Sequence, residues 1–300
     1  MSAALDVYLY GMTVLSTVHR VALDTPTLDG YGEILESHVC PGGEAMNGAL
    51  VLSSLGLKTA LGGPHWGTET ARSLGQYAAR AGIDVTKITV ADDHPGVRDL
   101  VLVCGAQRCV LGWFGSYFSQ NPRRWDEPDA QAIARARVVA IDPFFGDSSL
   151  GAADLCRNAG KPYVTIDCEA VSELHRHAAA TVVSREYRKR QFPGATDEQL
   201  LGEYTARGAG LTIFTSGSDP LYYARAGRAP RSVLPPKVSV TSTLGAGDVF
   251  RAGIVYGLVR AQSDSECVEF ATALAALCCT RFPIADHAPS LAEVEGFRKR

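Results

Sequence analysis

The sequence lacks the features of membrane-bound, secreted and nucleic-acid-binding chains. No apolar run approaches the length of a membrane span, and the longest lies near Phe270 to Cys279. No basic segment precedes the short apolar run near the N-terminus, which argues against a signal peptide. The net charge is only -3, so the chain has no general attraction for nucleic acid or an anionic membrane. We therefore expect a soluble cytoplasmic protein with neither of these partners.

Several familiar site motifs are also missing. The eight cysteines include no C-x-x-C pair, so neither a zinc site nor a disulfide framework is implied, and small core cysteines of a reducing compartment are expected. The sequence contains no G-x-x-x-x-G-K-[ST], and no G-x-G-x-x-G follows the first apolar run. His-Glu-x-x-His and Gly-x-Ser-x-Gly are absent as well. A P-loop, a dinucleotide fold, a zincin and a serine hydrolase are therefore not indicated.

What the chain does have is a regular alternation of strand and helix patterns. With 46% hydrophobic residues, its 300 residues suffice for one large α/β domain. From residue 137 onward we expect strands at Val138–Ile141, Tyr163–Ile166, Thr181–Val183 and Leu211–Phe214, with helices between them at Ser148–Ala159, Val171–His177 and Asp197–Arg207. Such alternation predicts a doubly wound, mostly parallel sheet flanked by helices. Ligands of these sheets bind beyond the carboxyl ends of the strands.

The stretch Val238 to Leu258 organises the rest of the chain. An apolar run at Val238–Val240 indicates a strand, Gly245-Ala246-Gly247 a turn, and the apolar pattern that follows a helix. The free amides of Ala246, Gly247 and Asp248 at the start of that helix would form an anion site. A carboxylate at this point is unexpected. Asp248 could cap the helix, or it could accept a proton from a hydroxyl that attacks a bound phosphate.

A second turn and helix lie near the N-terminus. Gly42-Gly43 is a tight turn, and an apolar helical pattern follows up to Gly56. Asn47 falls in the first turn of that helix, where its amide could cap the helix or face a ligand. A further strand is expected at Thr59–Leu61, and further helices at Thr68–Arg80, Val268–Thr280 and Leu291–Arg298. The β-rich segments 12–40 and 92–112 lack helices and are expected to form a separate small sheet.

The motifs around both turns are similar to the signatures of the PfkB, or ribokinase-like, carbohydrate kinases. The first is Ser242-Thr243-Leu244-Gly245-Ala246-Gly247-Asp248, and the second is Gly-Gly-x-x-x-Asn with its helix. The resemblance implies one ribokinase-like domain over residues 1–300. In it Asp248 is the base, and the amides at Gly245, Ala246 and Gly247 form an anion hole. It implies sugar contacts from Gly43 and Asn47, and a small-sheet lid that also forms a homodimer contact.

The same resemblance assigns the nucleotide and metal sites. Thr215-Ser216-Gly217, after an apolar strand, is a generic turn by itself but is similar to the family's ATP-contacting Thr-x-Gly. Ser184 and Thr272 are implied on the nucleotide side, although an apolar helix face explains Thr272 equally well. ATP and Mg²⁺ are the implied cofactors, with a monovalent cation left open. The weak metal candidates are Glu186, Asp142 and Asp167.

The chain also departs from the family at two positions. Ser16 stands where many relatives carry an Asp that binds two sugar hydroxyls, so the substrate's hydroxyl pattern is expected to differ. Ser184-Arg185-Glu186-Tyr187 replaces the Asn-x-x-Glu that organises Mg²⁺. A serine at the Asn position and Thr-Leu before the glycines are similar to ketohexokinase-like members.

We interpret the chain as an ATP-dependent carbohydrate kinase that phosphorylates a hydroxyl of a sugar or sugar-like alcohol. A nucleoside kinase is one alternative, with base stacking on aromatics drawn from Trp66, Trp113, Phe114, Tyr117 and Phe118, although packing is their simpler use. A regulatory protein that keeps the pocket without catalysis is the other. A run of cations, Arg185, Arg188, Lys189 and Arg190, is interpreted as a solvated helix face.

Overall fold

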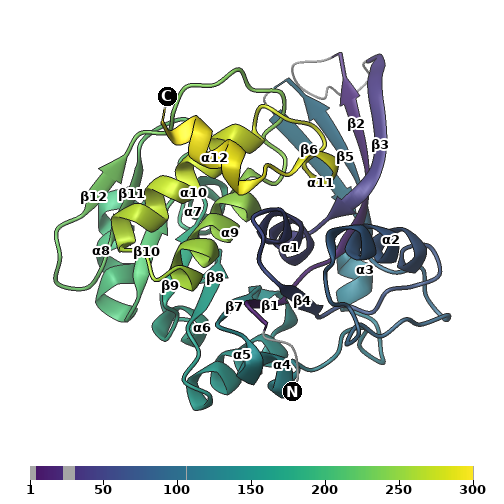
Figure 1. Ribbon diagram of the computed structural model, residues 1–300, viewed down its shortest axis with the longest axis horizontal. Coiled ribbons are helices and arrows are strands. Elements are labelled where there is room, and N and C mark those ends of the chain that lie inside the picture. Colours follow the sequence, from purple (N-terminus) through teal and green to yellow (C-terminus); the bar gives the residue numbers. More distant parts are fainter. Residues whose placement is uncertain (1–4, 23–30, 106, 300) are drawn as a thin grey trace.

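The computed structural model describes residues 5–22, 31–105 and 107–299, and an eight-stranded sheet, sheet A, lies at its centre (Figure 1). Its strands, in spatial order, are β12 (Arg231–Val233), β11 (Leu221–Ala224), β10 (Leu211–Phe214), β9 (Ala180–Val183), β8 (Tyr163–Ile166), β7 (Val138–Ile141), β1 (Val7–Tyr10) and β4 (Thr59–Gly62). The strands from β10 to β4 pair in parallel, whereas β11 and β12 are antiparallel at one edge. The parallel strands are apolar runs because both faces of the sheet are covered.

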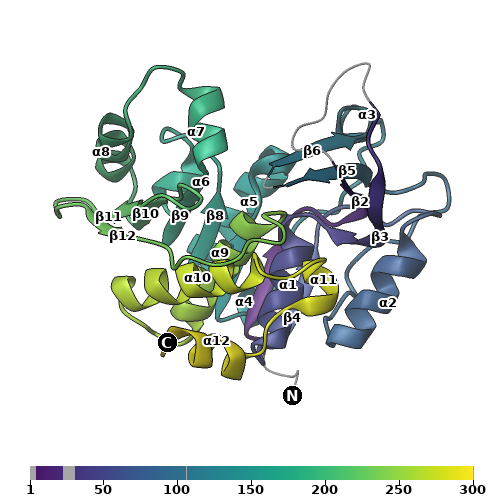
Figure 2. The same ribbon diagram turned by 90° about the horizontal axis from the view of Figure 1, so that it is seen from above.

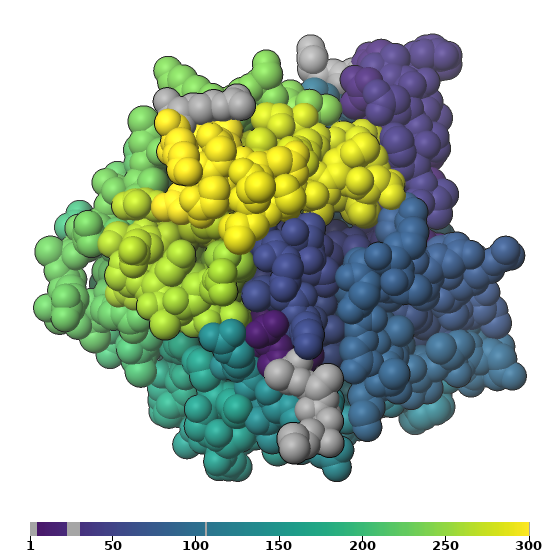
Figure 3. All heavy atoms as spheres, viewed as in Figure 1, coloured from purple at the N-terminus to yellow at the C-terminus, as the bar shows by residue number. Residues whose placement is uncertain are grey.

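Helices cover the two faces of sheet A as two groups. One face carries α1 (Glu44–Ser54), α2 (Ala71–Ala81), α9 (Ala246–Val259), α10 (Asp264–Cys278), α11 (Ile284–His287) and α12 (Leu291–Arg298). The opposite face carries α3 (Phe114–Phe118), α4 (Ala130–Arg135), α5 (Asp147–Asn158), α6 (Glu173–Arg176), α7 (Arg185–Gln191) and α8 (Asp197–Arg207). Figure 3 shows the C-terminal helices, in yellow, on the surface of the first face. In the described part of the chain, no helix is long and apolar enough to cross a membrane.

A smaller sheet, sheet B, stands apart from sheet A. It consists of β3 (Ile34–Gly42), β2 (Val14–Val21), β5 (Arg98–Cys104) and β6 (Gln107–Gly112), in that spatial order. Its inner face packs on Leu244, which precedes α9, and on Tyr77 of α2. Figure 2 shows sheet B and the α7–α8 region on opposite sides of the molecule, with α9 between them. The expected separate sheet is confirmed, while residues 23–30 of the expected segment 12–40 lie outside the described residues.

The strand predicted at Val238–Val240 is wrong. These residues form an extended loop between β12 and α9, and Val240 is half exposed. The backbone amides of the next two residues, Thr241 and Ser242, donate to the carbonyl of Cys279 at the end of α10 and not to a strand. Two consecutive prolines just before this segment remove the amide donors that a sheet ladder needs.

Two predicted helices are shorter than expected. The helix predicted at Thr68–Arg80 begins only at Ala71, because Thr70 and its neighbours form a turn on the Gly67 carbonyl. The one predicted at Val171–His177 is reduced to Glu173–Arg176, which begins where the Ser172 hydroxyl accepts a bond from the Leu174 amide. The short elements α3, α4, α11, β11 and β12 were not predicted.

Candidate active site

The predicted turn at Gly245 to Asp248 starts helix α9, and it places Asp248 against a residue of α1. Gly245 has a φ of 75°, a left-handed conformation that favours glycine, and it turns the loop into the helix. In the described part of the chain, no backbone amide donates to the Asp248 carboxylate as the capping interpretation required. Its Oδ2 instead accepts a hydrogen bond of 2.8 Å from Nδ2 of Asn47. The two signature residues, 201 positions apart, therefore meet in one half-buried contact.

Two backbone amides remain available beside this carboxylate. The Ala246 amide donates to the Thr243 carbonyl, which corrects the prediction of three free amides. In the described part of the chain, no acceptor is found for the amides of Gly247 and Asp248. A Cβ built on Gly247 would meet nothing within 4 Å, so the space over this helix start is open. The positive end of α9 and its free donors suit a bound anion.

A buried ion pair lies beneath the two signatures. Arg251, one turn after Asp248 in α9, pairs with Asp142 at the end of β7, and both side chains are almost completely buried. The second Asp142 oxygen accepts a bond of 2.7 Å from the Met12 amide. A side chain at Gly11 would overlap that carboxylate. Glycine at position 11 is therefore required for the close packing of β1 against this pair.

The surroundings of Asp248 raise its pKa. Burial is the main cause, and the nearby Asp142 carboxylate adds to it, while the Asn47 hydrogen bond and the charge of Arg251 oppose it. Glu44, the first residue of α1, has a pKa well above its usual range because it is desolvated and lies near both aspartates. A carboxyl group whose pKa is moved toward neutrality is suited to take a proton in catalysis.

The Gly42-Gly43 turn lies under the start of sheet B. Gly43 has a φ of 88°, and a Cβ there would come within 2.5 Å of the Met12 carbonyl oxygen, so only glycine fits. A Cβ at Gly42 would overlap the Ser16 hydroxyl, which places Ser16 directly against this turn. The predicted sugar contacts are therefore neighbours in space, in a series that ends at Asp248: Ser16, Gly43 and Asn47.

The predicted nucleotide turn follows β10 and is held by an unexpected cation. Arg188 is buried, and it donates to the carbonyls of Val183 and Thr215, to Ser216 Oγ and to the Asp197 carboxylate. The interpretation of Arg188 as part of a solvated face is therefore wrong. Its guanidinium donates to backbone carbonyls at the ends of β9 and β10, which would otherwise need water as their hydrogen-bond donor. Gly217 has a φ of 63°, as the turn requires.

The hydroxyl of Thr272, predicted on the nucleotide side, is bonded within its own helix. Thr272 is buried in α10, and its hydroxyl donates a bond of 2.6 Å to the Val268 carbonyl of its own helix. Because this hydrogen bond uses the hydroxyl's only proton, no donor remains for a nucleotide.

The candidate metal residues lie in different surroundings. Asp142 is committed to Arg251. Asp167 accepts from the Ser184 amide at 2.7 Å and from the Ser184 hydroxyl at 2.8 Å. Glu186 is exposed, and its charge raises the pKa of Asp167, so the two carboxylates are close. In the described part of the chain, no three His, Cys, Asp or Glu residues gather as a ready metal site.

The aromatic residues named for base stacking are mostly part of the packing. Trp66 is buried, and its indole donates to Thr13 Oγ1 at 2.9 Å. Tyr117 is buried in the core cluster that Phe114 and Phe118 also contact. Trp113 is exposed and lies under the guanidinium of Arg98. Nothing in this arrangement favours a base-binding surface.

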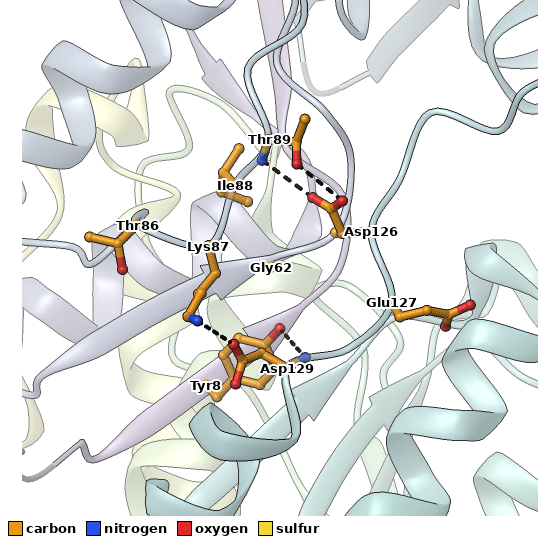
Figure 4. Close-up of a pocket in the computed structure, with 10 residues that line it drawn as sticks. Tyr8, Gly62, Thr86, Lys87, Ile88, Thr89, Asp126, Glu127 and Asp129 are labelled. Atoms are coloured by element: carbon orange, nitrogen blue, oxygen red, sulfur yellow. Dashed lines mark hydrogen bonds and ion pairs between the residues drawn. The ribbon is translucent and has the colours of Figure 1, made fainter.

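A cavity of about 350 Å³ has a different set of lining residues (Figure 4). Its lining comes mainly from two loops, 86–89 and 126–129, with Tyr8 of β1. An ion pair between Lys87 and Asp129 and hydrogen bonds from Thr89 to Asp126 already satisfy its polar groups. None of the predicted site residues lines this cavity.

Three residues at or near the site were missed by the sequence interpretation, and two of them left a signal. Arg251 is the one cation within the apolar pattern of α9, and Asp99 is a carboxylate at an inward position of the alternating strand β5. Arg188 lies five residues after the end of β9, in a run of cations whose spacing is that of a surface helix. The signal that Arg251 and Asp99 share is a charged residue at a position where the pattern demands an apolar one.

Comparison with known proteins finds one family over most of the chain. Residues 35–290 match the pfkB family carbohydrate kinase. The 5-dehydro-2-deoxygluconokinase of Shouchella clausii is 23% identical over 277 residues, which are 85% of this chain and 85% of that protein.

Solved structures of similar shape include ribokinases and an archaeal nucleoside kinase of the ribokinase family. The Arabidopsis thaliana ribokinase, solved with ribose and ATP, has a TM-score of 0.82 at 20% identity and covers 99% of this chain and 100% of its own. A protein from E. coli assigned as ribokinase II, solved with ATP and Mg²⁺, has a TM-score of 0.80 at 16% identity, with 99% of both chains covered. At these identities the comparison establishes a ribokinase-like fold.

Proposed function

The chain belongs to the pfkB family of carbohydrate kinases, and we propose that it transfers the γ-phosphoryl group of ATP to a hydroxyl of a sugar, with Asp248 as the base. The family match confirms the resemblance drawn from the two signatures and makes the chain a phosphotransferase with an alcohol acceptor. The identity of the sugar is a separate question, because the relatives are named for a deoxygluconate derivative and for ribose.

The observation that carries the proposal is the pairing of Asp248 with Asn47 beside free amides. The Asn47 amide holds Oδ2 of Asp248, so the other carboxylate oxygen remains to receive the hydroxyl proton. The amides of Gly247 and Asp248 would stabilise the charge that develops on the transferred phosphoryl group. In this arrangement the proton acceptor and the anion donors come from the same helical turn, so their relative position is fixed.

The nucleotide and its metal fit residues on the other side of α9. The turn at Thr215 to Gly217, held by Arg188, offers open backbone at the end of β10 for ATP. Mg²⁺ keeps several waters and takes one or two carboxylates together with the phosphates. Glu186 and the neighbouring Asp167 would supply these one or two carboxylates. When bound, Mg²⁺ would supply positive charge to the phosphates.

Sheet B is proposed as the lid over the sugar, formed by the segments 12–40 and 92–112 of one domain. Its inner face packs on Leu244, directly before the anion-binding turn. Its outer face exposes apolar side chains, and we propose that it forms a homodimer. A cytoplasmic location is proposed because all eight cysteines are free, as expected in a reducing compartment.

Replacement of the base tests the function. Asp248→Asn should lower kcat by at least ~10²-fold while ATP affinity is largely kept, because only proton transfer is lost. ADP release across a panel of sugars gives kcat, and calorimetry gives ATP binding. Asp147→Asn, at the start of α5, is the matched control and should leave kcat unchanged. Near-normal turnover of the Asp248 variant would refute the assigned role.

A further inference from the structure

The inner face of sheet B carries a carboxylate that the proposed mechanism does not use. Asp99 of β5 is only 9% exposed, and its Oδ1 is shielded from solvent with no hydrogen-bond partner in the described part of the chain. A buried carboxylate oxygen without a donor costs free energy, which a bound hydroxyl would recover. The unsatisfied oxygen therefore marks a position at which a ligand donor is expected.

Strand register places Asp99 beside the sugar turn. The paired residues Cys40, Ser16, Asp99 and Gly112 form one row across the four strands. Because directly paired residues share a face, Asp99 and Ser16 lie on the same side as the buried Cys40. The Ser16 hydroxyl lies against Gly42, and Gly43 begins the helix that carries Asn47. Asp99 therefore neighbours Ser16, the first of the predicted sugar contacts in the series that ends at Asp248.

Within the described residues, the electrostatic surroundings of Asp99 leave its carboxyl group without a charged partner. Burial raises its pKa, and the hydrogen bond from Ser16 lowers it. No cation is among the causes of its shift, so its charge has no buried partner like the one Asp142 has in Arg251.

The charges around the site are unfavourable for an anionic substrate. Glu44 and Asp248 lie close together, and the charge of Arg251 is already matched by Asp142. Arg108 of β6, whose charge reaches Asp248, pairs with Val103. That position is two rows from Asp99, with a row of His38, Val18, Val101 and Val110 between them. Arg108 therefore suits the phosphoryl side, and the row of Asp99 itself holds no cation.

We infer that Asp99 and Ser16 form a specificity subsite that accepts hydroxyl protons of an uncharged sugar, so that the enzyme selects neutral sugars over sugar acids. This inference rests on the proposed function. It requires that the sugar lie between sheet B and the Gly42-Gly43 turn, with one hydroxyl donating to Asp99 Oδ1 and another held near Asp248.

Matched pairs of substrates test the inference on the unmodified enzyme. Ribose with ribonate, glucose with gluconate, and 2-deoxyglucose with 2-deoxygluconate differ in charge at one end while most of their hydroxyls are kept. The wild-type enzyme should show a kcat/KM at least ~100-fold higher for the neutral member of the best pair, since a carboxylate would meet unpaired acceptors. A preference for the acid in that pair would overturn the inference.

The residue itself is tested by Asp99→Asn, which keeps the shape of the side chain. The KM for the best neutral sugar should rise about 10- to 100-fold, the loss expected for a hydrogen bond to a charged acceptor. The kcat and the KM for ATP should change little. Glu36→Gln, on the same sheet in the row of Arg20, is the control and should leave the sugar KM unchanged. An unchanged KM in the folded Asp99 variant would overturn the assignment.

A second measurement separates this inference from the proposed function. If the wild-type enzyme releases no ADP with either series, the kinase proposal fails, and titration calorimetry with the same pairs then decides the subsite. Binding of a neutral sugar that Asp99→Asn weakens at least ~10-fold would support the subsite. Absence of neutral sugar binding, or equal binding by the variant, would overturn it. Ser16→Ala gives a smaller loss in the same direction and serves if the Asp99 variant does not fold.

Discussion

At the scale of single residues, Asn47 controls the protonation of the base. Its amide donates to Asp248 and lowers a pKa that burial raises. The charged groups that face Asp248 from the neighbouring elements are Glu44, Asp142, Arg251 and Arg108. None of them replaces the short hydrogen bond from α1, because none donates to the same oxygen. Asn47 is therefore a positioning residue for the base as well as a proposed sugar contact.

We predict that Asn47→Ala moves the acid limb of the pH profile to higher pH. Asp248 works deprotonated, so activity falls as pH drops through its pKa, and loss of the Asn47 bond raises that pKa further. The measurement is kcat/KM from about pH 5 to about pH 9. Asn158→Ala, at the exposed end of α5, should keep the wild-type profile. A limb that stays in place, or moves to lower pH, would contradict this role for Asn47.

At the scale of elements, the Arg251 and Asp142 pair joins α9 to the end of β7. Both charges are withdrawn from water, and the pair also receives the Met12 amide from the chain after β1. A buried pair of this kind contributes little compared with an apolar replacement, but removal of one partner leaves the other charge uncompensated. The contact thus fixes where α9 begins and, with it, where Asp248 lies.

We predict that Arg251→Met lowers the free energy of unfolding by about 3–5 kcal/mol. The double variant with Asp142→Asn should recover most of this loss, because no unpaired charge remains and Asn still accepts from Met12. Urea denaturation of the single and double variants measures both effects. Arg157→Met, in the exposed pair with Asp154, is the control and should cost less than about 1 kcal/mol. Additive losses in the double variant would argue against a buried pair.

Elements were predictable from sequence where local pattern and burial agree. Val138–Ile141, Tyr163–Ile166 and Leu211–Phe214 are apolar runs that are buried on both faces, and their bounds match the structure. Val238–Val240 has the same composition, but it lies in a loop and pairs with no strand. Arg188 was missed for a related reason, since its acceptors lie at the ends of two other strands. Contacts between distant segments decide both cases, and no local pattern records them.

The candidate site also has residues that the sequence predicts and contacts that it does not predict. Asn47 and Asp248 belong to short motifs whose residue types require a particular turn, so each could be named from its own segment. Their contact, and the neighbourhood of Asp99, depend on the register of sheet B and on the packing of α1 against α9. The sequence therefore indicated the residues of the two motifs, and the fold determines which other residues surround them.

At the scale of the whole molecule, the outer face of sheet B has no covering element in the described part of the chain. Val39, Thr17, Leu100 and Leu111 form one row across its four strands. Val39 is 57% exposed and Leu111 is 54% exposed. An exposed apolar row across the face of a sheet favours association with another copy of the chain. A dimer through this face would also stiffen the sheet that carries Asp99.

We predict that Val39→Glu with Leu111→Glu converts a dimer into a monomer. Each added carboxylate would face its symmetry-related neighbours across a two-fold interface, where charge burial is costly. Light scattering after size-exclusion chromatography gives the mass, which should fall from two copies to one 31.9 kDa chain. Leu234→Glu changes an equally exposed leucine outside sheet B and should leave the mass unchanged. If the wild-type protein is monomeric, or the double variant stays dimeric, the outer face of sheet B is not the interface. If the variant is monomeric and its sugar KM also rises, the dimer contributes to the rigidity of the Asp99 subsite.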